Sequence, residues 1–600
     1  MNRCAPGSST CCRSGALKLC GPALFKYLWP LALPGLLFTA GCKPKTQEPT
    51  ETALCTAPGH SISAIQGTGE RSALTGHTTS VRGIVTRLEA GRGLWLQEAG
   101  REPPGAASRA LFIADDDLAK VAQPGSEMLL HGRVAELGDS PDTLTALVGL
   151  SAHEVCGTAA ELPLTSVTLP MVAEQREAVE GMRAEFSQRL TVSDVYYLYN
   201  GGLTLSSGGV LRVPTEIAEP GAAARQIAAQ NEARSIRSEL GNPSQGGRDR
   251  TVPVGSTLAG ATGLFGHQRG EQRFLLDPPV AFETPSVADL AAPAAGQLRI
   301  VSLNLLNYFN GDGQGGGFPT ARGAKTPREF QEQKRRIGAA LAKMQPQLLA
   351  VQELENDGFG PDSAARSLLG VLNESVGDDW AVIEVAEGIG RDLITVGLFY
   401  RARLIEPVGK ARVLEGPEFR RLNRVPLAQR FRHRDSGREF LLAVNHLKSK
   451  GGCPNGGENA DQRDGQACWN AARGNAVRAL LPWLQQLARD MGTENLLIVG
   501  DMNSWRREDP VDIFRQAGYQ DLAEELSGRP QHSFRYWGQL GTLDYAFASA
   551  ALAVHAIAAQ NWPANTVWPR RMTPPKPWLR VSDHDPVIVD FAFSQSATSN

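Results

Sequence analysis

The eight residues Leu496-Leu497-Ile498-Val499-Gly500-Asp501-Met502-Asn503 carry the strongest signal for the fold class of this chain. The apolar run predicts a strand that is buried on both faces, and Gly500 predicts its end. Asp501 and Asn503 lie two residues apart, so their side chains point to the same side of the chain. Acid and amide side chains at the end of a buried strand are typical of α/β enzymes, although a plain Asp/Asn turn has the same composition.

Other predicted strands in the second half of the chain deliver polar side chains in the same way. Strands over Arg299–Leu303 and Leu348–Val351, separated by a helix over Pro327–Met344, alternate as in an α/β unit. This alternation indicates a catalytic domain over 298–594, followed by a polar tail at 595–600. The residues at or near predicted strand ends are Asn304, Glu353, His446, Asp501, Asn503, Asp544, Asp583 and His584.

These residue types suit the hydrolysis of a phosphate ester with the help of a divalent cation. Mg²⁺ takes carboxylate and amide oxygens as ligands, so Glu353, Asp583 and Asn304 are candidate metal ligands. A hydrolase also needs a base for the attacking water. His584 beside Asp544 would serve, because a carboxylate fixes the tautomer of the ring. The side chains suited to meeting the negative charge of a phosphoryl transition state are Asn503 and His446.

The first 42 residues predict an export signal. An apolar run over Tyr27–Phe38 follows scattered basic residues and is too short to span a bilayer. It ends in Thr39-Ala40-Gly41-Cys42, which is similar to a lipoprotein cleavage site with Cys42 as the lipidated residue. Cleavage as a plain secreted protein is the alternative. We therefore expect an exported protein, either a membrane-anchored lipoprotein facing the periplasm or the cell surface or a secreted protein, with a polar tether over 43–59.

Four cysteines remain after this segment: Cys55, Cys156, Cys453 and Cys468. An even number in an oxidising compartment predicts two disulfides, with three connectivities open. Pairing of Cys453 with Cys468 would close a local loop, and pairing of Cys55 with Cys156 would join the two ends of the first domain. A metal site is less favoured, because the spacings lack a C-x-x-C pair.

Residues 60–158 predict a small β-barrel, because five short strand-like runs alternate with turn residues. The first runs look like the start of an OB-fold, whose groove would bind single-stranded nucleic acid if Trp95 and Phe112 stacked on bases. A spacer domain is the alternative reading. Residues 160–285 predict a mixed middle region with a helix over Ala222–Leu240, and residues 286–297 predict a linker.

Length and composition limit the number of domains and the ways in which the chain could hold a ligand. A length of 600 residues predicts two to four domains. Hydrophobic content of 42% and charged content of 21% are ordinary for a soluble globular protein. The formal net charge of −2 provides no global positive field. A nucleic-acid ligand would therefore have to be held by local basic patches or by metal ions.

Six motifs stand in the order typical of the endonuclease/exonuclease/phosphatase superfamily, which the chain resembles. They are Ser302-Leu303-Asn304, Val351-Gln352-Glu353, Asn445-His446, Gly500-Asp501-Met502-Asn503, Thr542-Leu543-Asp544-Tyr545 and Ser582-Asp583-His584-Asp585-Pro586-Val587. The stretches Asn304–Phe309 and Asn445–Gly451 and the Cys453–Cys468 loop further resemble ExeM/NucH-type bacterial extracellular nucleases, with Leu447 and Tyr545 as departures from the common pattern. The resemblance implies an α/β (α+β) fold, a four-layer sandwich of two mixed sheets flanked by helices, preceded by an OB-like β-barrel.

The resemblance also implies site roles. Glu353, Asp583 and Asn304 would bind Mg²⁺, with Mn²⁺ or Ca²⁺ as alternatives. His584, oriented by Asp544, would be the general base. Asp501 and Asn503 would hold the nucleophile or the scissile phosphate. His446 resembles the second histidine of the deoxyribonuclease branch, and it would contact the phosphate and aid the leaving oxygen.

Further residues would surround this centre. Asp392, just before a predicted strand, is a candidate partner of His446. Arg424 lies in an Arg-x-Pro stretch similar to one that contacts substrate in the superfamily, and Lys448 and Lys450 follow His446 directly. Each phosphate contact would make binding more dependent on salt.

These expectations converge on an exported, metal-dependent nuclease. It would cleave DNA, with RNA as a further candidate, and leave 5′-phosphate ends. One alternative keeps the fold and takes phospholipid or inositol-phosphate head groups as substrates. Another is a lipoprotein that captures nucleic acid without cutting it. The implied partners are nucleic acid and, through the lipid anchor, a membrane; no protein partner is implied.

Overall fold

The computed structural model describes residues 55, 59–99, 105, 107–139, 143–240, 251–268, 270–286, 289–385, 389–571 and 574–593. All of them belong to one compact unit, 52–600. The predicted signal peptide 1–42 with Cys42, most of the tether and the polar tail lie outside the described residues. Within the described ranges, no helix combines the length and the apolar character needed to cross a bilayer.

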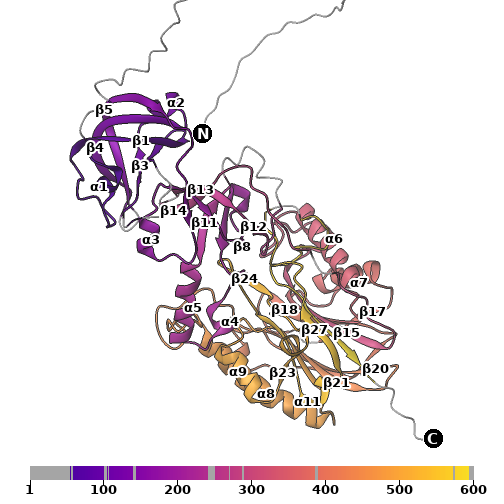
Figure 1. Cartoon of the computed structure of the whole chain (residues 1–600). Coiled ribbons are helices and arrows are strands. Elements are labelled where there is room, and N and C mark those ends of the chain that lie inside the picture. Colours follow the sequence, from indigo (N-terminus) through magenta and orange to yellow (C-terminus); the bar gives the residue numbers. More distant parts are fainter. Residues whose placement is uncertain are drawn as a thin grey trace, which may run out of the picture. The chain divides into compact units, whose positions relative to one another are not determined.

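Five strands near the N-terminus close into a barrel in the order β1-β2-β3-β5-β4 (Figure 1, indigo). They are β1 (Thr78–Glu89), β2 (Gly93–Gln97), β3 (Ala110–Ile113), β4 (Ser126–Leu137) and β5 (Leu144–Thr158), accompanied by α1 (Ile62–Gln66) and α2 (Asp116–Val121). Cys55 and Cys156 form a disulfide. Trp95 and Phe112 are buried and pack against Leu264 and Leu275 of the middle region. The prediction that these two rings could stack on bases is therefore wrong, because they belong to the core.

The middle region forms an eight-stranded sheet in the order β12-β8-β9-β11-β14-β13-β7-β6. Its strands are β6 (Thr165–Val167), β7 (Arg183–Phe186), β8 (Leu190–Asp194), β9 (Gly202–Ser206), β11 (Ser235–Glu239), β12 (Thr257–Leu258), β13 (Ala261–Gln268) and β14 (Glu271–Leu276). The accompanying helices are α3 (Ala173–Glu177), η1 (Leu198–Asn200), α4 (Pro214–Ile217) and α5 (Ala222–Ala233).

The predicted helix over Ala222–Leu240 is wrong in its last part. The helix α5 ends at Ala233, and β11 begins at Ser235. The strand pairs antiparallel with β9 and buries Ile236 while Arg237 faces solvent. Pairing with a neighbouring strand thus overrides the local helical pattern.

The C-terminal half contains two six-stranded mixed sheets. The first has the order β17-β18-β16-β15-β28-β27, and the second has the order β19-β20-β21-β22-β26-β23. The first sheet consists of β15 (Gln297–Tyr308), β16 (Leu348–Glu355), β17 (Trp380–Val382), β18 (Ile394–Arg401), β27 (Ala556–Asn561) and β28 (Val587–Ala592). The second consists of β19 (Ile405–Val413), β20 (Leu427–His433), β21 (Glu439–His446), β22 (Leu496–Asp501), β23 (Gln520–Asp521) and β26 (Asp544–Ala548).

Helices pack against both sheets, which makes this a mixed α/β fold. They are α6 (Pro327–Met344), α7 (Ala364–Ser375), η4 (Pro417–Phe419), α8 (Asn470–Asp490), α9 (Asp509–Gln516), α10 (Leu522–Leu526) and α11 (Ala550–Ala553). In β15, Ile300 packs in one core with the second sheet and α8, while the next residue, Val301, packs with α6 and α7. The first sheet is therefore buried on both faces, as the apolar runs predicted.

Two residues that were predicted near the ends of strands lie instead at or before the starts of strands. Asp544 begins β26, and Asp583 lies in the loop that precedes β28. Both strands run antiparallel to the neighbour that they join, β22 and β15 respectively. The start of an antiparallel strand lies at the same sheet edge as the end of its neighbour. The side chains consequently reach the expected edge from the other direction.

A small three-stranded sheet joins the middle region to the C-terminal half. It has the order β10-β25-β24, with β10 (Leu211–Arg212), β24 (Phe534–Tyr536) and β25 (Gln539–Gly541). Leu211 pairs with Gln539 in parallel register. The middle region therefore reaches the β24–β25 hairpin, which lies close to the C-terminal motifs.

Candidate active site

Strand pairing brings three predicted site residues into one row. The strand β22 runs parallel to β21 and antiparallel to β26, and the registers pair His446 with Asp501 and Asp501 with Asp544. Gly500 is needed for this close approach, because it has φ 129° and a Cβ there would collide with the carbonyl oxygen of Asn445. The apolar strand read from the sequence thus presents Asp501 at the centre of the row.

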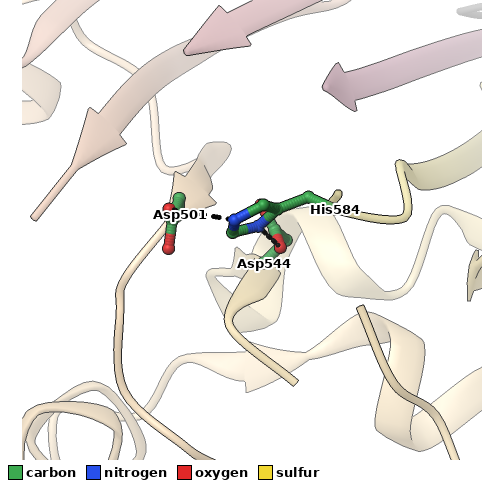
Figure 2. Close-up of side chains that lie close together, drawn as sticks. All are labelled: Asp501, Asp544 and His584. Carbon is green, nitrogen blue, oxygen red and sulfur yellow. Dashed lines mark hydrogen bonds and ion pairs between the residues drawn. The ribbon is translucent and has the colours of Figure 1, made fainter. Parts of the chain in front are cut away.

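His584 joins this row from the loop before β28. Its Nδ1 lies 2.7 Å from Oδ2 of Asp544, and its Nε2 lies 3.9 Å from Oδ2 of Asp501 (Figure 2). Because an ionised carboxylate only accepts hydrogen bonds, Nδ1 carries the proton and donates it to Asp544. His446 approaches the same Asp501 oxygen with its Nε2 at 3.5 Å. One buried carboxylate therefore lies between two imidazole rings.

Burial and mutual charge give these groups different protonation states. Burial works to lower the pKa of His584, but the carboxylates of Asp544 and Asp501 outweigh it and hold that pKa well above its ordinary value. Burial raises the pKa of Asp501 to about 7, although His584 opposes the rise. Burial, together with the charges of Arg424 and His584, holds the pKa of His446 well below its ordinary value. The site thus pairs an imidazole that favours its charged form with one that stays neutral.

Asn503 supports Asp501. The Oδ1 of Asp501 accepts from the backbone N–H of Asn503 at 2.8 Å, and its Oδ2 accepts from the Asn503 amide at 3.0 Å. The same amide also donates to the carbonyl of Leu447 at 3.1 Å. Its backbone has φ 48°, a left-handed conformation that is uncommon outside glycine. In this structure Asn503 therefore fixes the carboxylate of Asp501.

Glu353 lies where β16 departs from its regular ladder. The register with β18 shifts between Val351 and Leu354, and Glu353 itself has φ 60°. Its Oε2 accepts from both the backbone N–H and the side-chain amide of Asn307, each at 2.8 Å. Asn307 is left-handed too, with φ 54°. Strained backbone on two neighbouring strands is typical of a functional site.

The oxygen donors around Glu353 fit a hard divalent cation. Burial and the like charge of Asp583 raise the pKa of Glu353. Asn304 lies beside this carboxylate, with its Oδ1 accepting from the N–H of Leu306 at 3.0 Å. Its side-chain amide also donates to the Glu353 carboxylate, which works against the rise in the pKa of that carboxyl. Two carboxylates and an amide are a suitable donor set for Mg²⁺, so Glu353, Asp583 and Asn304 remain the candidate ligands.

A second group of potential ligand atoms consists of Asp501, Asp544 and His584, whose atoms lie within 4.8 Å of one another. The Nδ1 of His584 is already bonded to Asp544 and is not free to bind a metal. A carboxylate–imidazole pair of this kind is suited to moving a proton. The Glu353 group therefore remains a candidate for the metal, and the His584 group is a candidate for proton transfer.

Arg424 reaches toward the site, and Asp392 does not pair with His446 as predicted. The carboxylate of Asp392 lies 3.4 Å from Nε of Arg424 and 3.6 Å from a guanidinium nitrogen of Arg322. Two nearby guanidinium groups attract the carboxylate more strongly than a neutral imidazole does. Arg424 donates to the carbonyl of Leu447 at 3.2 Å.

The two predicted substrate lysines have other partners. Lys450 is held by Glu508 at 2.5 Å and by the carbonyl of Gln466 at 2.8 Å. Burial lowers its pKa to about 8, although Glu508 opposes the shift. Lys448 donates to the carbonyls of Ser449 and Gly451. Both ammonium groups therefore contact the loop that the Cys453–Cys468 disulfide closes and its neighbours, and Lys450 in particular has a structural role.

Several residues at the site carried no signal in the sequence. The ring of Phe534, from β24, lies 4.7 Å from that of His584. The hydroxyl of Ser533 accepts from the N–H of Asp544 at 2.9 Å. Asn565 donates to the carbonyl of His584 at 2.6 Å. All three come from irregular segments or very short strands, where hydrophobic periodicity gives no information.

Part of this chain is similar to known proteins. Residues 301–584 match the Endonuclease/Exonuclease/phosphatase family. Nocturnin from Homo sapiens is 24% identical over 313 residues, which span 50% of this chain and 66% of Nocturnin, just under two thirds of its length. The solved human Nocturnin catalytic domain with bound sulfate anion has 20% sequence identity and a TM-score of 0.33, and the match covers 50% of this chain and 97% of that domain. The structure of D. rerio TDP2 complexed with single strand DNA product has 17% identity and a TM-score of 0.32, with coverages of 49% and 98%.

Proposed function

We propose that this chain, whose residues 301–584 form a domain of the Endonuclease/Exonuclease/phosphatase family, is a metal-dependent phosphodiesterase that hydrolyses DNA, with RNA as a second substrate class. Water would attack the phosphate and leave a 5′-phosphate end. The single observation that carries the proposal is the arrangement of Asp501 between His446 and His584, with Asp544 on the far nitrogen of His584.

The proposed roles follow from the contacts. Asp544 holds the proton on Nδ1 of His584, so Nε2 faces the water and takes its proton when the ring is neutral. Asp501 lies within reach of Nε2 and orients that water. His446, neutral and buried, donates a hydrogen bond to a phosphate oxygen. Arg424 adds positive charge at the edge of the site, where negative charge develops in the transition state.

Glu353, Asp583 and Asn304 would hold the cation, for which Mg²⁺ is the first choice and Mn²⁺ or Ca²⁺ are alternatives. A bound divalent cation would supply positive charge that polarises the phosphate and offsets the carboxylates that raise the pKa of His584. Without it, Glu353 and Asp583 repel each other.

The proposed setting is outside the cytoplasm. We propose that the chain is exported as a lipoprotein anchored through Cys42, or as a secreted protein, in the manner of the ExeM/NucH-type nucleases. Two disulfides support this setting, because they persist in oxidising compartments. The barrel order β1-β2-β3-β5-β4 supports an OB-like domain. We infer that this barrel is a spacer, because its two candidate stacking rings are buried.

Plasmid cleavage tests the proposal. Residues 43–600 should nick plasmid DNA with Mg²⁺ and not with EDTA, and His584→Ala should be slower by at least about 100-fold. His153→Ala, which removes an exposed histidine on β5, is the matched control and should cleave like the wild type. Wild-type protein that retards DNA without cleaving it would favour nucleic-acid capture. Hydrolysis of phospholipid or inositol phosphate in place of DNA would favour the other alternative.

A further inference from the structure

A cleft of about 310 Å³ lies beside Asp583, one of the candidate metal ligands. One wall comes from the β24–β25 hairpin and the other from the loop that follows β8 in the middle region. Its lining includes Tyr196, Tyr197, Tyr536, Trp537, Arg570 and Arg580. The mechanism proposed above gives this cleft no role.

Exposed aromatic side chains gather at this cleft. Among the described residues, four aromatic side chains are strongly exposed: Trp537 (72%), Tyr536 (56%), Tyr196 (47%) and Tyr197 (40%). All four line the same cleft. Scattered exposed apolar residues are normal, but a group of large rings in one hollow indicates a binding surface.

The tip of the hairpin has an unfavourable sequence for its conformation. Trp537 has φ 47° and Gly538 has φ 77°, the positive values that a type I′ turn requires at both central positions. Such turns favour Asn-Gly, and a tryptophan at the first position costs energy. An exposed ring on a strained backbone contributes little to the stability of the fold, so the presence of Trp537 at this position points to a ligand.

The two segments that carry the rings are held together before any ligand binds. The carboxylate of Asp194 accepts from the backbone N–H of Tyr196 and from Arg535, each at 3.0 Å. A Cβ added to Gly538 would lie 2.8 Å from the Cβ of Asp194, so the hairpin tip packs directly on this loop. The two walls are therefore connected, and the backbone that carries the rings is preorganised.

Charge restricts the occupant further. Arg570 and Arg580 line the cleft together with Asp583. Arg580 also donates to the carbonyl of Ser582 at 2.7 Å, and the third lining arginine, Arg535, is paired with Asp194. The occupant should thus combine flat apolar faces with negative charge and continue toward the phosphate at the metal site. Unpaired nucleotides have these properties, because every base has a face that stacks on aromatic rings.

We propose that this cleft binds the unpaired bases of a single-stranded nucleic acid next to the scissile phosphate, with Trp537 as the main stacking ring. The proposal rests on the function proposed above and specifies the substrate as single-stranded, or locally unpaired, near the cut. It also assigns a role to the middle region, which supplies one wall of the substrate site.

Binding of short oligomers to residues 43–600 in EDTA, followed by fluorescence anisotropy, tests the proposal without cleavage. The probes are fluorescein-labelled dT10 and a ten-unit strand of the same charge that lacks bases. Wild-type protein should bind dT10 at least about tenfold more tightly than the abasic strand. Equal affinity for the two strands would overturn the proposal.

Variants of Trp537 locate the effect. Trp537→Asn creates an Asn-Gly turn, so the variant should keep or raise the Tm. It should bind dT10 about 5- to 100-fold more weakly and bind the abasic strand as the wild type does. Trp537→Phe should retain most of the affinity. Val554→Ala, which truncates an exposed apolar side chain away from the cleft, is the control. Full dT10 affinity in Trp537→Asn would contradict the assignment.

Two further measurements separate this proposal from the function on which it rests. Hydrolysis of bis(p-nitrophenyl) phosphate by wild-type protein with Mg²⁺ reports the chemistry without any base. If that activity is absent while Trp537→Asn still loses dT10 binding, the proposed function fails and the cleft assignment stands. Binding of phosphatidylglycerol vesicles that depends on Trp537, with no binding of dT10, would overturn the cleft assignment in favour of a lipid.

Discussion

Glu216, in the short helix α4 of the middle region, forms a buried ion pair with Arg506 in the loop that follows β22. The Oε1 of Glu216 lies 3.2 Å from Nε of Arg506, and it also accepts from the hydroxyl of Thr542 at 2.9 Å. Thr542 lies two residues before Asp544, and Arg506 lies three residues after Asn503. One carboxylate of the middle region therefore fixes two loops that carry the candidate active site.

Removal of this carboxylate should destabilise the whole unit. Glu216→Ala would leave Arg506 buried with fewer partners, and breaking a buried pair in this way costs about 3–5 kcal/mol. Urea unfolding measures the change in the free energy of unfolding. Glu219→Ala, at an exposed position just after the same helix, is the matched control. Equal stability of the two variants would mean that Arg506 is satisfied without Glu216.

Asp544→Asn should abolish most of the activity and leave the fold intact. An amide at this position no longer fixes the proton on Nδ1 of His584, so Nε2 is no longer reliably available as a base. We expect kcat to fall by about 100- to 10,000-fold, with little change in KM. Plasmid nicking and circular dichroism measure the two effects. A large rise in KM with kcat unchanged would indicate that Asp544 acts in substrate binding.

Glu353→Gln should have opposite effects on stability with and without metal. Without metal, the variant removes a buried charge that faces Asp583, so the Tm in EDTA should rise. With Mg²⁺, the wild type should gain stability by binding the ion, and the variant should lose that gain. Thermal unfolding across a Mg²⁺ series measures both effects. If the gain with Mg²⁺ persists unchanged in the variant, Glu353 does not bind the ion.

Glu180 should make stability decrease as pH rises. It is buried where the barrel meets the middle region, and burial, followed by Glu177 and Glu136, raises its pKa well above 4.5. The folded state therefore keeps a proton that the unfolded state has already lost, so stability is complete below about pH 4.5 and falls as the pH rises above it. Glu180→Gln should be more stable than the wild type at pH 8 and similar at pH 4.5. If the difference in the free energy of unfolding between Glu180→Gln and the wild type is the same at pH 4.5 and pH 8, the prediction is contradicted.

The clustering of the motif residues at one sheet edge was easier to predict from the sequence than the directions of the strands that carry them. Buried strands such as β22 and the helix α6 have clear apolar periodicity, and residues 301–584, which span most of the six motifs, match the family that these motifs resemble. The positions of Asp544 and Asp583 at strand starts were not predicted, because an apolar run does not show whether a strand is parallel or antiparallel to its neighbour.

Other features depend on contacts between distant parts of the chain. The pairing of Asp392 with Arg424 follows from two loops meeting in space, and the spacing in sequence does not encode it. The same holds for the cleft, where Tyr196 and Trp537 come from segments that are separated by more than half of the chain. The end of α5 was mispredicted, because β9 supplies hydrogen bonds that local helix propensity does not anticipate.

The β10–β25 pairing also determines when the protein can finish folding. Leu211 leaves the ribosome long before its partner Gln539, and the Glu216–Thr542 bond spans 326 residues. During synthesis, the middle region therefore carries an unpaired strand edge until the last motifs emerge, and Glu216 has its neighbour Arg212 as a partner but not yet Arg506 or Thr542. Contacts of such long range form slowly and expose the chain to aggregation meanwhile. We expect the chain to depend on chaperones during its synthesis, until this long-range pairing forms.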